Sequence, residues 1–176
     1  GSAMIWLAKF DDAQVMEGLK TATVMMGVPT FYTRLLDNPA FDAAAAANIR
    51  VFISGSAPLL ESTFDEFERR TGKRLLERYG MSEAVVITSN PLDGARIPGS
   101  VGYPLPGVEV RIGGAEETGV VEIRGPSVFS GYWRMPEKTA EDFTADGWFI
   151  TGDVGRLDPD GRLWISGRAK DLIISG

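Results

Sequence analysis

The pattern of apolar residues changes near Asn90, and this change limits the folds that the chain can adopt. Before Asn90, segments of helical periodicity alternate with short apolar runs typical of buried strands. After it the chain is rich in Gly and Pro as far as Gly107, and short alternating strands follow between turn residues. We therefore expect an α/β fold, with a partial layered α/β lobe over residues 5–100 followed by a small β-barrel-like subdomain over residues 101–176.

Local signals place the individual elements. Helices are predicted from Asp11–Asp12, from Pro29, and over residues 60–71 with Gly72 as the C-cap. The alanine-rich run 43–47 predicts a short surface helix, and residues 158–161 predict a hairpin turn. The predicted strands are residues 23–28, 50–54, 74–79, 84–88, 108–112, 120–124, 154–157 and 163–166.

Composition excludes several kinds of chemistry. The 176 residues contain no Cys and no His, which excludes disulfides, Cys/His zinc sites and Ser-His-Asp triads from this stretch. The net charge of −6 disfavours nucleic acid as a partner. No apolar run approaches the ~20 residues that span a bilayer, so we expect no membrane insertion and a cytoplasmic protein. Residues 1–4 resemble the remnant of an expression tag.

Four polar or glycine-rich clusters each follow a predicted strand. In open α/β sheets ligands bind at the carboxyl ends of strands, which makes these loops candidate site segments. Taken singly, each cluster is also typical of an ordinary turn or of solvated surface charge. The four clusters are Ser54–Pro58, Tyr79–Glu83, Thr151–Asp153 and Gly167–Asp171.

The side chains of these clusters suit a nucleotide. Small residues in the first cluster let a flat ligand approach the backbone. The Tyr79 ring can stack on a base, the Ser82 hydroxyl can donate to a phosphate oxygen, and the Glu83 carboxylate can hold Mg²⁺. Asp153 can accept two hydrogen bonds from a ribose diol, as acidic residues do in dinucleotide sites.

Together, the order and spacing of these clusters resemble the adenylate-forming superfamily, which includes the acyl-CoA synthetases. Gly131–Trp133 and Pro136–Thr139 lie at the expected places between the second and third clusters. Within the superfamily the malonyl-CoA synthetases are the most similar group, on the segments Pro29–Leu35, Ser54–Ser56, Glu77–Met81 and Thr88–Pro91. The resemblance implies that the chain is a fragment of the large N-terminal domain of an acyl-CoA synthetase.

The resemblance also implies an activity. It is that of an ATP-dependent acid–thiol ligase, which activates a carboxylic acid such as malonate or methylmalonate as an acyl-adenylate and transfers it to coenzyme A. The implied ligands are ATP and AMP, Mg²⁺, coenzyme A and the small acid. The phosphate loop and the lysine-bearing C-terminal domain of the family are absent from the 176 residues, so we expect the isolated chain to be inactive.

Roles for single residues follow from the resemblance. It implies that Gly55, Ser56, Ala57 and Pro58 border the adenine and acyl pockets. It places the Tyr79 ring on the base, with Gly80 and Met81 in the same nucleotide-binding segment.

The remaining implied roles concern the phosphates, the ribose and domain motion. Ser82 bonds the α-phosphate and Glu83 binds Mg²⁺, and these two residues are the implied catalytic pair. Asp153 and Arg168 bind the ribose hydroxyls. Asp171 matches the hinge about which the small C-terminal domain of the family rotates.

The acid pocket depends on Arg34. A dicarboxylate needs a partner for its second charge, and a planar guanidinium bonds both oxygens of a carboxylate. We expect Arg34 to bind the distal carboxylate, with Ser56 as a further donor; a surface arginine is the alternative. Two other functions stay open, namely a ligase for an aryl or fatty monocarboxylate and a non-catalytic nucleotide-binding module.

Overall fold

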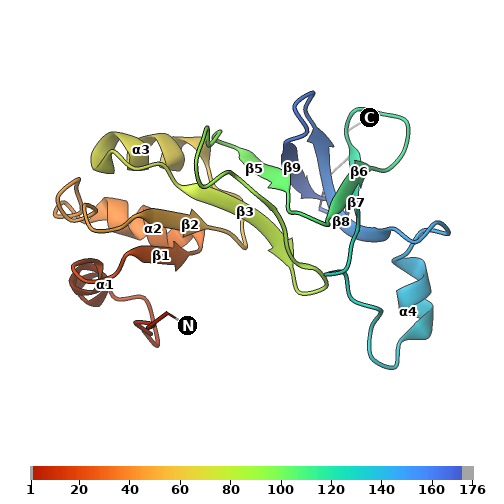
Figure 1. Cartoon of the computed structure of the whole chain (residues 1–176), viewed down its shortest axis with the longest axis horizontal. Helices are drawn as coiled ribbons and strands as arrows, with labels where there is room; N and C mark the ends of the chain where they lie inside the picture. The colour runs from red at the N-terminus through yellow and green to blue at the C-terminus, as the bar shows by residue number, and fades with distance from the viewer. Residues whose placement is uncertain (1, 172–176) are drawn as a thin grey trace. The chain divides into compact units, whose positions relative to one another are not determined.

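The structure is a computed structural model that describes residues 2–171, and these residues form two compact units (Figure 1). The first unit runs to Glu77 and includes Pro91–Gly99, and the second comprises Arg78–Asn90 and the residues from Ser100 onward. The helices are α1 (Asp12–Leu19), α2 (Pro29–Asp37), α3 (Glu61–Thr71) and α4 (Pro136–Glu141). The strands are β1 (Val24–Gly27), β2 (Val51–Ser54), β3 (Leu76–Met81), β4 (Val85–Ser89), β5 (Ser100–Pro104), β6 (Glu109–Ile112), β7 (Gly119–Arg124), β8 (Phe149–Leu157) and β9 (Leu163–Arg168).

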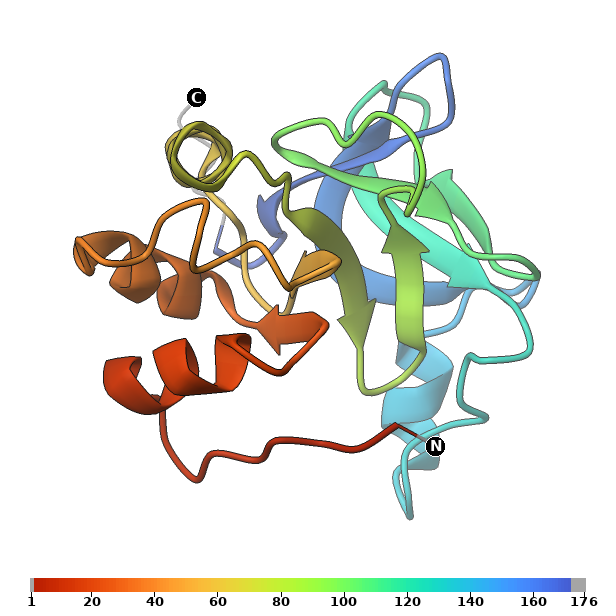
Figure 2. The same ribbon diagram turned by 60° about the vertical axis from the view of Figure 1, so that its left-hand side comes forward.

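The first unit packs helices α1, α2 and α3 beside the parallel strands β1, β2 and the start of β3 (Figure 2). α1 begins where the Asp11 carboxylate accepts the Gln14 N–H at 2.9 Å, which satisfies a donor that the helix itself cannot pair. α3 ends at Gly72, whose φ of 69° is the left-handed C-cap conformation. The core of this unit contains four aromatic rings in mutual contact, from Tyr32, Phe41, Phe52 and Phe67.

The second unit is an antiparallel sheet. Its strand order is β3-β4-β5-β9-β8-β7-β6, and the β3–β4 hairpin is visible in Figure 2. Within the described residues this order is open, so the strands form a sheet that does not close into a barrel. The hydrophobic core of the unit lies between the strands and the segment that carries Phe129 and Phe143.

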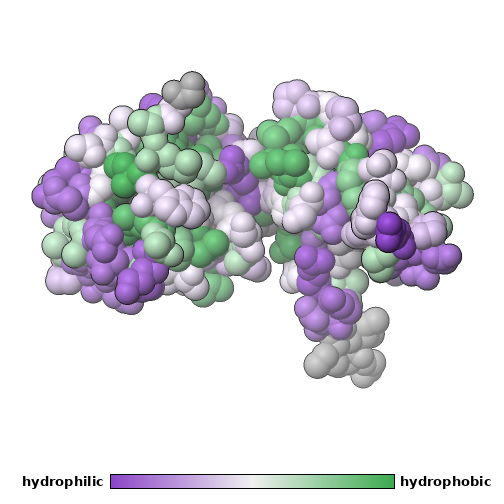
Figure 3. All heavy atoms as spheres, turned by 90° about the horizontal axis from the view of Figure 1, so that it is seen from below, coloured by the Kyte–Doolittle hydropathy of each residue, from purple (hydrophilic) through white to green (hydrophobic). Residues whose placement is uncertain are grey.

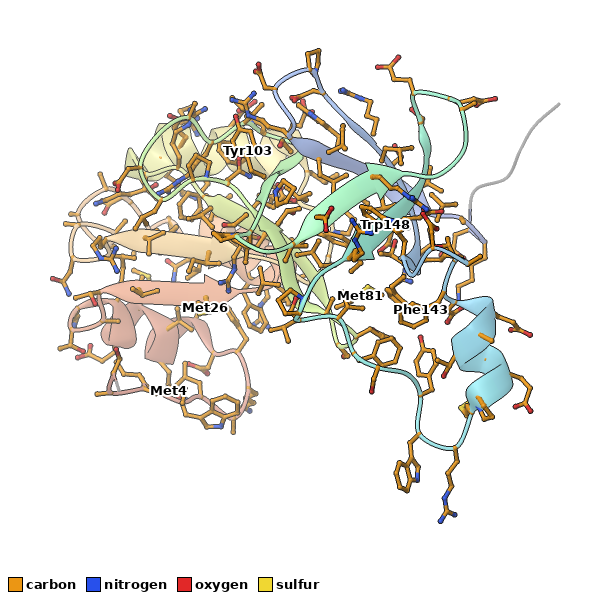
Figure 4. The ribbon with its side chains drawn as sticks, turned by 45° about the vertical axis from the view of Figure 1, so that its right-hand side comes forward. Met4, Met26, Met81, Tyr103, Phe143 and Trp148 are labelled. Carbon is orange, nitrogen blue, oxygen red and sulfur yellow. The ribbon has the colours of Figure 1, made fainter. Side chains whose placement is uncertain are left out.

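The buried Trp148 ring packs against arginines of β6 and β7 in the second unit (Figure 4). The guanidinium groups of Arg111 and Arg124 lie 4.3 and 4.6 Å from its ring, and the ring is only 8% exposed. Arg111 also bonds Glu122 at 2.6 Å and Asp146 at 2.7 Å. Cation–π contacts and a shared ion-pair network therefore hold β6, β7 and the loop before β8 together.

The predicted α/β class with a β-rich second part is confirmed, and no helix among residues 2–171 is long and apolar enough to cross a membrane. The predicted helix at 43–47 is wrong, because these residues form turns in which Ala46 is fully buried. The Asp42 carboxylate accepts the N–H groups of Ala44 and Ala45, which favours a turn over a continued helix. The domain boundary near residue 100 stays a prediction.

Candidate nucleotide site

Asp153 is a buried carboxylate of the second unit with two side-chain partners. It lies in β8, is 6% exposed, and its backbone N–H donates to Thr151 Oγ1 at 3.1 Å. Its carboxylate accepts a hydrogen bond from the Tyr79 hydroxyl to Oδ2 at 2.5 Å, and Arg168 Nε forms an ion pair with Oδ1 at 2.9 Å. Three residues that the sequence analysis took from three separate clusters thus meet at one buried charge.

Strand pairing produces this convergence. Asp153 and Arg168 are direct partners in the register of β8 and β9, so their side chains lie on the same face of the sheet. Gly152 precedes Asp153 within β8 and has a φ of 73°, a left-handed conformation that favours glycine. Burial, followed by the hydrogen bond to Asp153, raises the pKa of Tyr79 well above its usual range, so its hydroxyl keeps its proton and donates.

Gly80 fixes the backbone beside the Tyr79 ring. A Cβ at this position would lie 2.0 Å from the carbonyl oxygen of Val85, which only a glycine avoids. Val85 itself has a φ of 61°, a rare conformation for a β-branched residue. The close approach of the two hairpin strands therefore sets where the Tyr79 ring can lie.

Ser82 and Glu83 lie in the turn between β3 and β4. Ser82 is exposed, and Glu83 is half-buried. The Glu83 carbonyl accepts the Phe129 N–H at 2.8 Å, and its carboxylate Oε1 accepts the Tyr132 hydroxyl at 3.2 Å. Phe129 and Tyr132 thus support the turn, contacts that the sequence did not reveal.

Mg²⁺ fits this turn in one way. The described residues contain no group of three or more His, Cys, Asp or Glu that could hold a metal ion. Glu83 offers one carboxylate, and Mg²⁺ in nucleotide sites commonly takes one or two carboxylates together with phosphate oxygens and water. Glu83 therefore suits Mg²⁺ that arrives with a nucleotide.

The loop Gly55–Pro58 belongs to the first unit and follows β2. Ser56, Ala57 and Pro58 are exposed, and Ser56 has a φ of 69°. The next residue, Leu59, is buried in the core of this unit. The loop therefore presents small side chains and backbone groups to solvent, while its end is held by packing.

Glu77 is a buried carboxylate beside this loop that the sequence analysis did not single out as a site residue. It lies in β3, is 4% exposed, and its Oε1 accepts the Leu59 N–H at 3.4 Å. Burial raises its pKa to about 7, and the backbone hydrogen bond opposes the shift. Its place directly after the apolar pair Leu75–Leu76 was the available signal, although Glu is rarely fully buried.

The raised pKa of Glu77 predicts a pH-dependent stability. Because the folded-state pKa of about 7 exceeds the ordinary 4.5, the folded chain binds more protons, and stability falls as pH rises from about 5 to 8. Glu77→Gln keeps an acceptor for Leu59 and removes the titration. We expect it to remove on the order of 3 kcal/mol of the total loss of stability across this pH range, measured by urea unfolding at several pH values. The exposed Glu61→Gln is the control, and a Glu77→Gln profile parallel to wild type contradicts the assignment.

Arg34 lies on α2 in the first unit and is half exposed. Its Nη2 is 3.5 Å from Asp12 Oδ1, and its guanidinium lies 4.3 Å from the Phe10 ring centroid. Both contacts are made by residues at the start of the chain. The structure thus places Arg34 in a surface ion pair with Asp12. Its partner is a carboxylate, the same chemical group as the distal end of the predicted dicarboxylate substrate.

Asp171, the predicted hinge, lies in a turn after β9 and donates its N–H to the Arg168 carbonyl at 3.0 Å. Residues 172–176, at the end of the predicted β-rich subdomain, are outside the described residues. Tyr79–Glu83, Asp153, Arg168 and Asp171 all belong to the second unit. Gly55–Pro58 and Arg34 belong to the first unit.

The fold is that of a fragment of the N-terminal domain of adenylate-forming enzymes, and comparison gives the family. Residues 1–133 match the family described as AMP-binding enzyme. The chain belongs to this family. Over 158 residues it is 49% identical to the malonate–CoA ligase of Arabidopsis thaliana, an alignment that covers 83% of this chain and 26% of that protein.

Solved structures extend the comparison. The ATP-bound MatB from Rhodopseudomonas palustris matches 97% of this chain and 36% of its own, with 51% identity and a TM-score of 0.95. A malonyl-CoA ligase in a ternary product complex with methylmalonyl-CoA and AMP matches with 42% identity and a TM-score of 0.86, over 95% of this chain and 38% of its own. The chain thus spans about a quarter to somewhat over a third of the length of these relatives.

Proposed function

We propose that the protein containing this chain is an ATP-dependent acid–thiol ligase. The observation that carries the proposal is the buried Asp153 carboxylate, bonded by Tyr79 and Arg168, in a chain of the AMP-binding enzyme family. In the first step an oxygen of the substrate carboxylate attacks the α-phosphorus of ATP, and pyrophosphate leaves. In the second step the thiolate of coenzyme A attacks the acyl carbon, and AMP leaves. The thiol comes from coenzyme A, so the chain needs no cysteine of its own.

Within this proposal the residues of the second unit bind and orient the nucleotide. The Tyr79 ring stacks on the adenine, and Asp153 and Arg168 take the ribose hydroxyls. Ser82 donates to the α-phosphate, and Glu83 holds Mg²⁺. When bound, Mg²⁺ neutralises charge on the phosphate oxygens. Asp171 is the proposed hinge. The small residues of Gly55–Pro58 border the adenine and acyl pockets. The cytoplasmic location of the protein stays a prediction.

We propose malonate or methylmalonate as the acid, supported by the names of the relatives. The test is acid-dependent pyrophosphate exchange by the protein that contains this chain, comparing malonate, methylmalonate, acetate, octanoate and coumarate. We expect exchange with the first two acids only. Exchange with octanoate or coumarate alone identifies a monocarboxylate ligase, and no exchange with any acid indicates a nucleotide-binding module. The isolated 176-residue chain is expected to give no exchange.

Arg34 provides a separate prediction about the acid. Arg34→Ala should lower kcat/KM for malonate by about 10- to 100-fold, the range for losing hydrogen bonds to a charged group, and leave the KM for ATP unchanged. The control is Arg69→Ala, which removes another exposed helix arginine of the first unit that pairs with a carboxylate. An unchanged kcat/KM for malonate would assign Arg34 to its surface contact with Asp12 alone.

A further inference from the structure

The Tyr79 hydroxyl is joined to the proposed ribose-binding carboxylate by a short hydrogen bond. The oxygen–oxygen distance of 2.5 Å to Asp153 Oδ2 is at the short end for a charge-assisted O–H···O bond. The two residues are 74 positions apart in the sequence and meet only in the folded second unit. A base-stacking role alone requires the ring of Tyr79 and leaves this hydroxyl unexplained.

The two partners of the Asp153 carboxylate differ in how firmly they are held. The Arg168 side chain is 49% exposed, and it reaches Oδ1 through a long flexible stem at the end of β9. Tyr79 is half-buried, has only two side-chain torsions, and sits beside the close backbone contact of Gly80 with Val85. Water screens the ion pair of the half-exposed Arg168 more than it screens the part-buried hydrogen bond of Tyr79. Tyr79 therefore holds the Asp153 carboxylate in one orientation more firmly than Arg168 does.

The backbone of Asp153 does not set this orientation by itself. Thr151 Oγ1 accepts the Asp153 N–H and donates to the Val121 carbonyl at 2.8 Å, which fixes the strand. Rotation about the side-chain torsions of Asp153 remains, and the terminal torsion of an aspartate is broad. The hydrogen bond on Oδ2 and the ion pair on Oδ1 restrict that rotation and leave lone pairs of both oxygens for other donors.

We infer that Tyr79 is a positioning residue for the nucleotide ribose, acting through its hydroxyl on Asp153 in addition to any stacking by its ring. This inference rests on the proposed function. Its consequence is that the ring orientation at the base and the carboxylate orientation at the ribose are coupled through one side chain. Removal of the hydroxyl should therefore weaken recognition of the ribose while leaving the aromatic surface in place.

The test is Tyr79→Phe in the protein that contains this chain, with ATP and 3′-deoxy-ATP as substrates. We expect the KM for ATP to rise about tenfold, the KM for the acid to stay constant, and the preference for ATP over 3′-deoxy-ATP to shrink by a similar factor. In an Asp153→Asn background the same substitution should have little further effect, because its partner charge is gone. Tyr103→Phe removes a phenol hydroxyl elsewhere in the same unit and is the control.

Each other outcome overturns the inference. An unchanged KM for ATP in Tyr79→Phe would show that Tyr79 contributes to nucleotide binding only through its ring. An equal loss for ATP and 3′-deoxy-ATP, with a lowered Tm, makes the hydroxyl a structural group. Calorimetric binding of AMP and 3′-deoxy-AMP gives the same comparison without turnover. If the wild-type protein shows acid-dependent exchange while Tyr79→Phe behaves as wild type, the proposed function stands and this inference falls. If wild type neither turns over nor binds AMP, both fall.

Discussion

Gly102→Ala should destabilise the chain by more than about 4 kcal/mol, whereas Gly147→Ala should cost only about 1 to 2 kcal/mol. Gly102 lies in β5 and Gly147 in the loop before β8, and their φ angles are nearly equal, 83° and 84°. An alanine suffers the same left-handed strain at both positions. The measurement is the free energy of unfolding of the 176-residue chain in urea.

The two variants differ in the space that is available for the added Cβ. A Cβ on Gly102 would lie 2.1 Å from the carbonyl carbon and oxygen of Ser89 and 2.2 Å from the Asn90 nitrogen, whereas a Cβ on Gly147 meets nothing within 4 Å. Backbone atoms cannot move aside as a flexible side chain can, so β4 and β5 would have to separate. Their pairing of Thr88 with Pro104 and Ser89 with Tyr103 would be lost with it.

This separation would also reach the nucleotide site. β4 forms a hairpin with β3, which carries Tyr79, and β5 pairs with β9, which carries Arg168. Gly102 thus lies on the strand that connects two partners of Asp153. Equal destabilisation by the two alanine variants would show that strain at positive φ, and not the close approach of β4 and β5, dominates at Gly102.

Local signals predicted the first unit well because its elements are stabilised by neighbours in sequence. Asp11 caps α1, and Gly72 ends α3 as its C-cap. The turn at residues 158–161 also formed as predicted, with the Asp158 carboxylate accepting two backbone N–H groups. Each of these features depends on contacts within a few residues.

Long-range contacts explain what the sequence did not reveal. β5 lies in a segment whose Gly and Pro content indicated a loop, and it forms because Gly102 lets it approach β4 closely. The alanines at 43–47 have high helix propensity, yet the Asp42 cap and the burial of Ala46 favour turns. Close approach to a neighbouring strand decides the first case, and a local side-chain cap together with burial outweighs helix propensity in the second.

The candidate site shows the same division. Spacing placed Tyr79, Asp153 and Arg168 in separate clusters after strands, and the resemblance assigned them to one nucleotide. Their meeting at the Asp153 carboxylate depends on the antiparallel register of β8 with β9 and on the β3–β4 hairpin, neither of which a single sequence specifies. The Glu83 contact with Tyr132, 49 residues away, was hidden for the same reason.

Asp153→Asn should lower kcat/KM for ATP by about 100-fold or more in the protein that contains this chain. The amide keeps the shape of the side chain but loses the charge that would accept two ribose hydroxyls, and each hydrogen bond to a charged group contributes about 1.5 to 3 kcal/mol. The amide also turns an N–H₂ toward either Arg168, which cannot accept, or Tyr79, whose hydroxyl must then accept where it now donates, so one of the present contacts is lost or reversed. Steady-state kinetics at varied ATP and saturating acid measures the effect.

Asp160→Asn is the matched control for this substitution. Asp160 lies in the turn between β8 and β9, its side chain is 71% exposed, and it bonds Arg162 at 2.8 Å. The same change of carboxylate to amide should leave kcat/KM for ATP within about twofold of wild type, since an exposed ion pair contributes at most about 1 kcal/mol to stability and none to the ribose. A similar loss in both variants would mean that charge on this hairpin acts through folding. A loss confined to Asp153→Asn, with an unchanged KM for the acid, places the charge of Asp153 at the nucleotide.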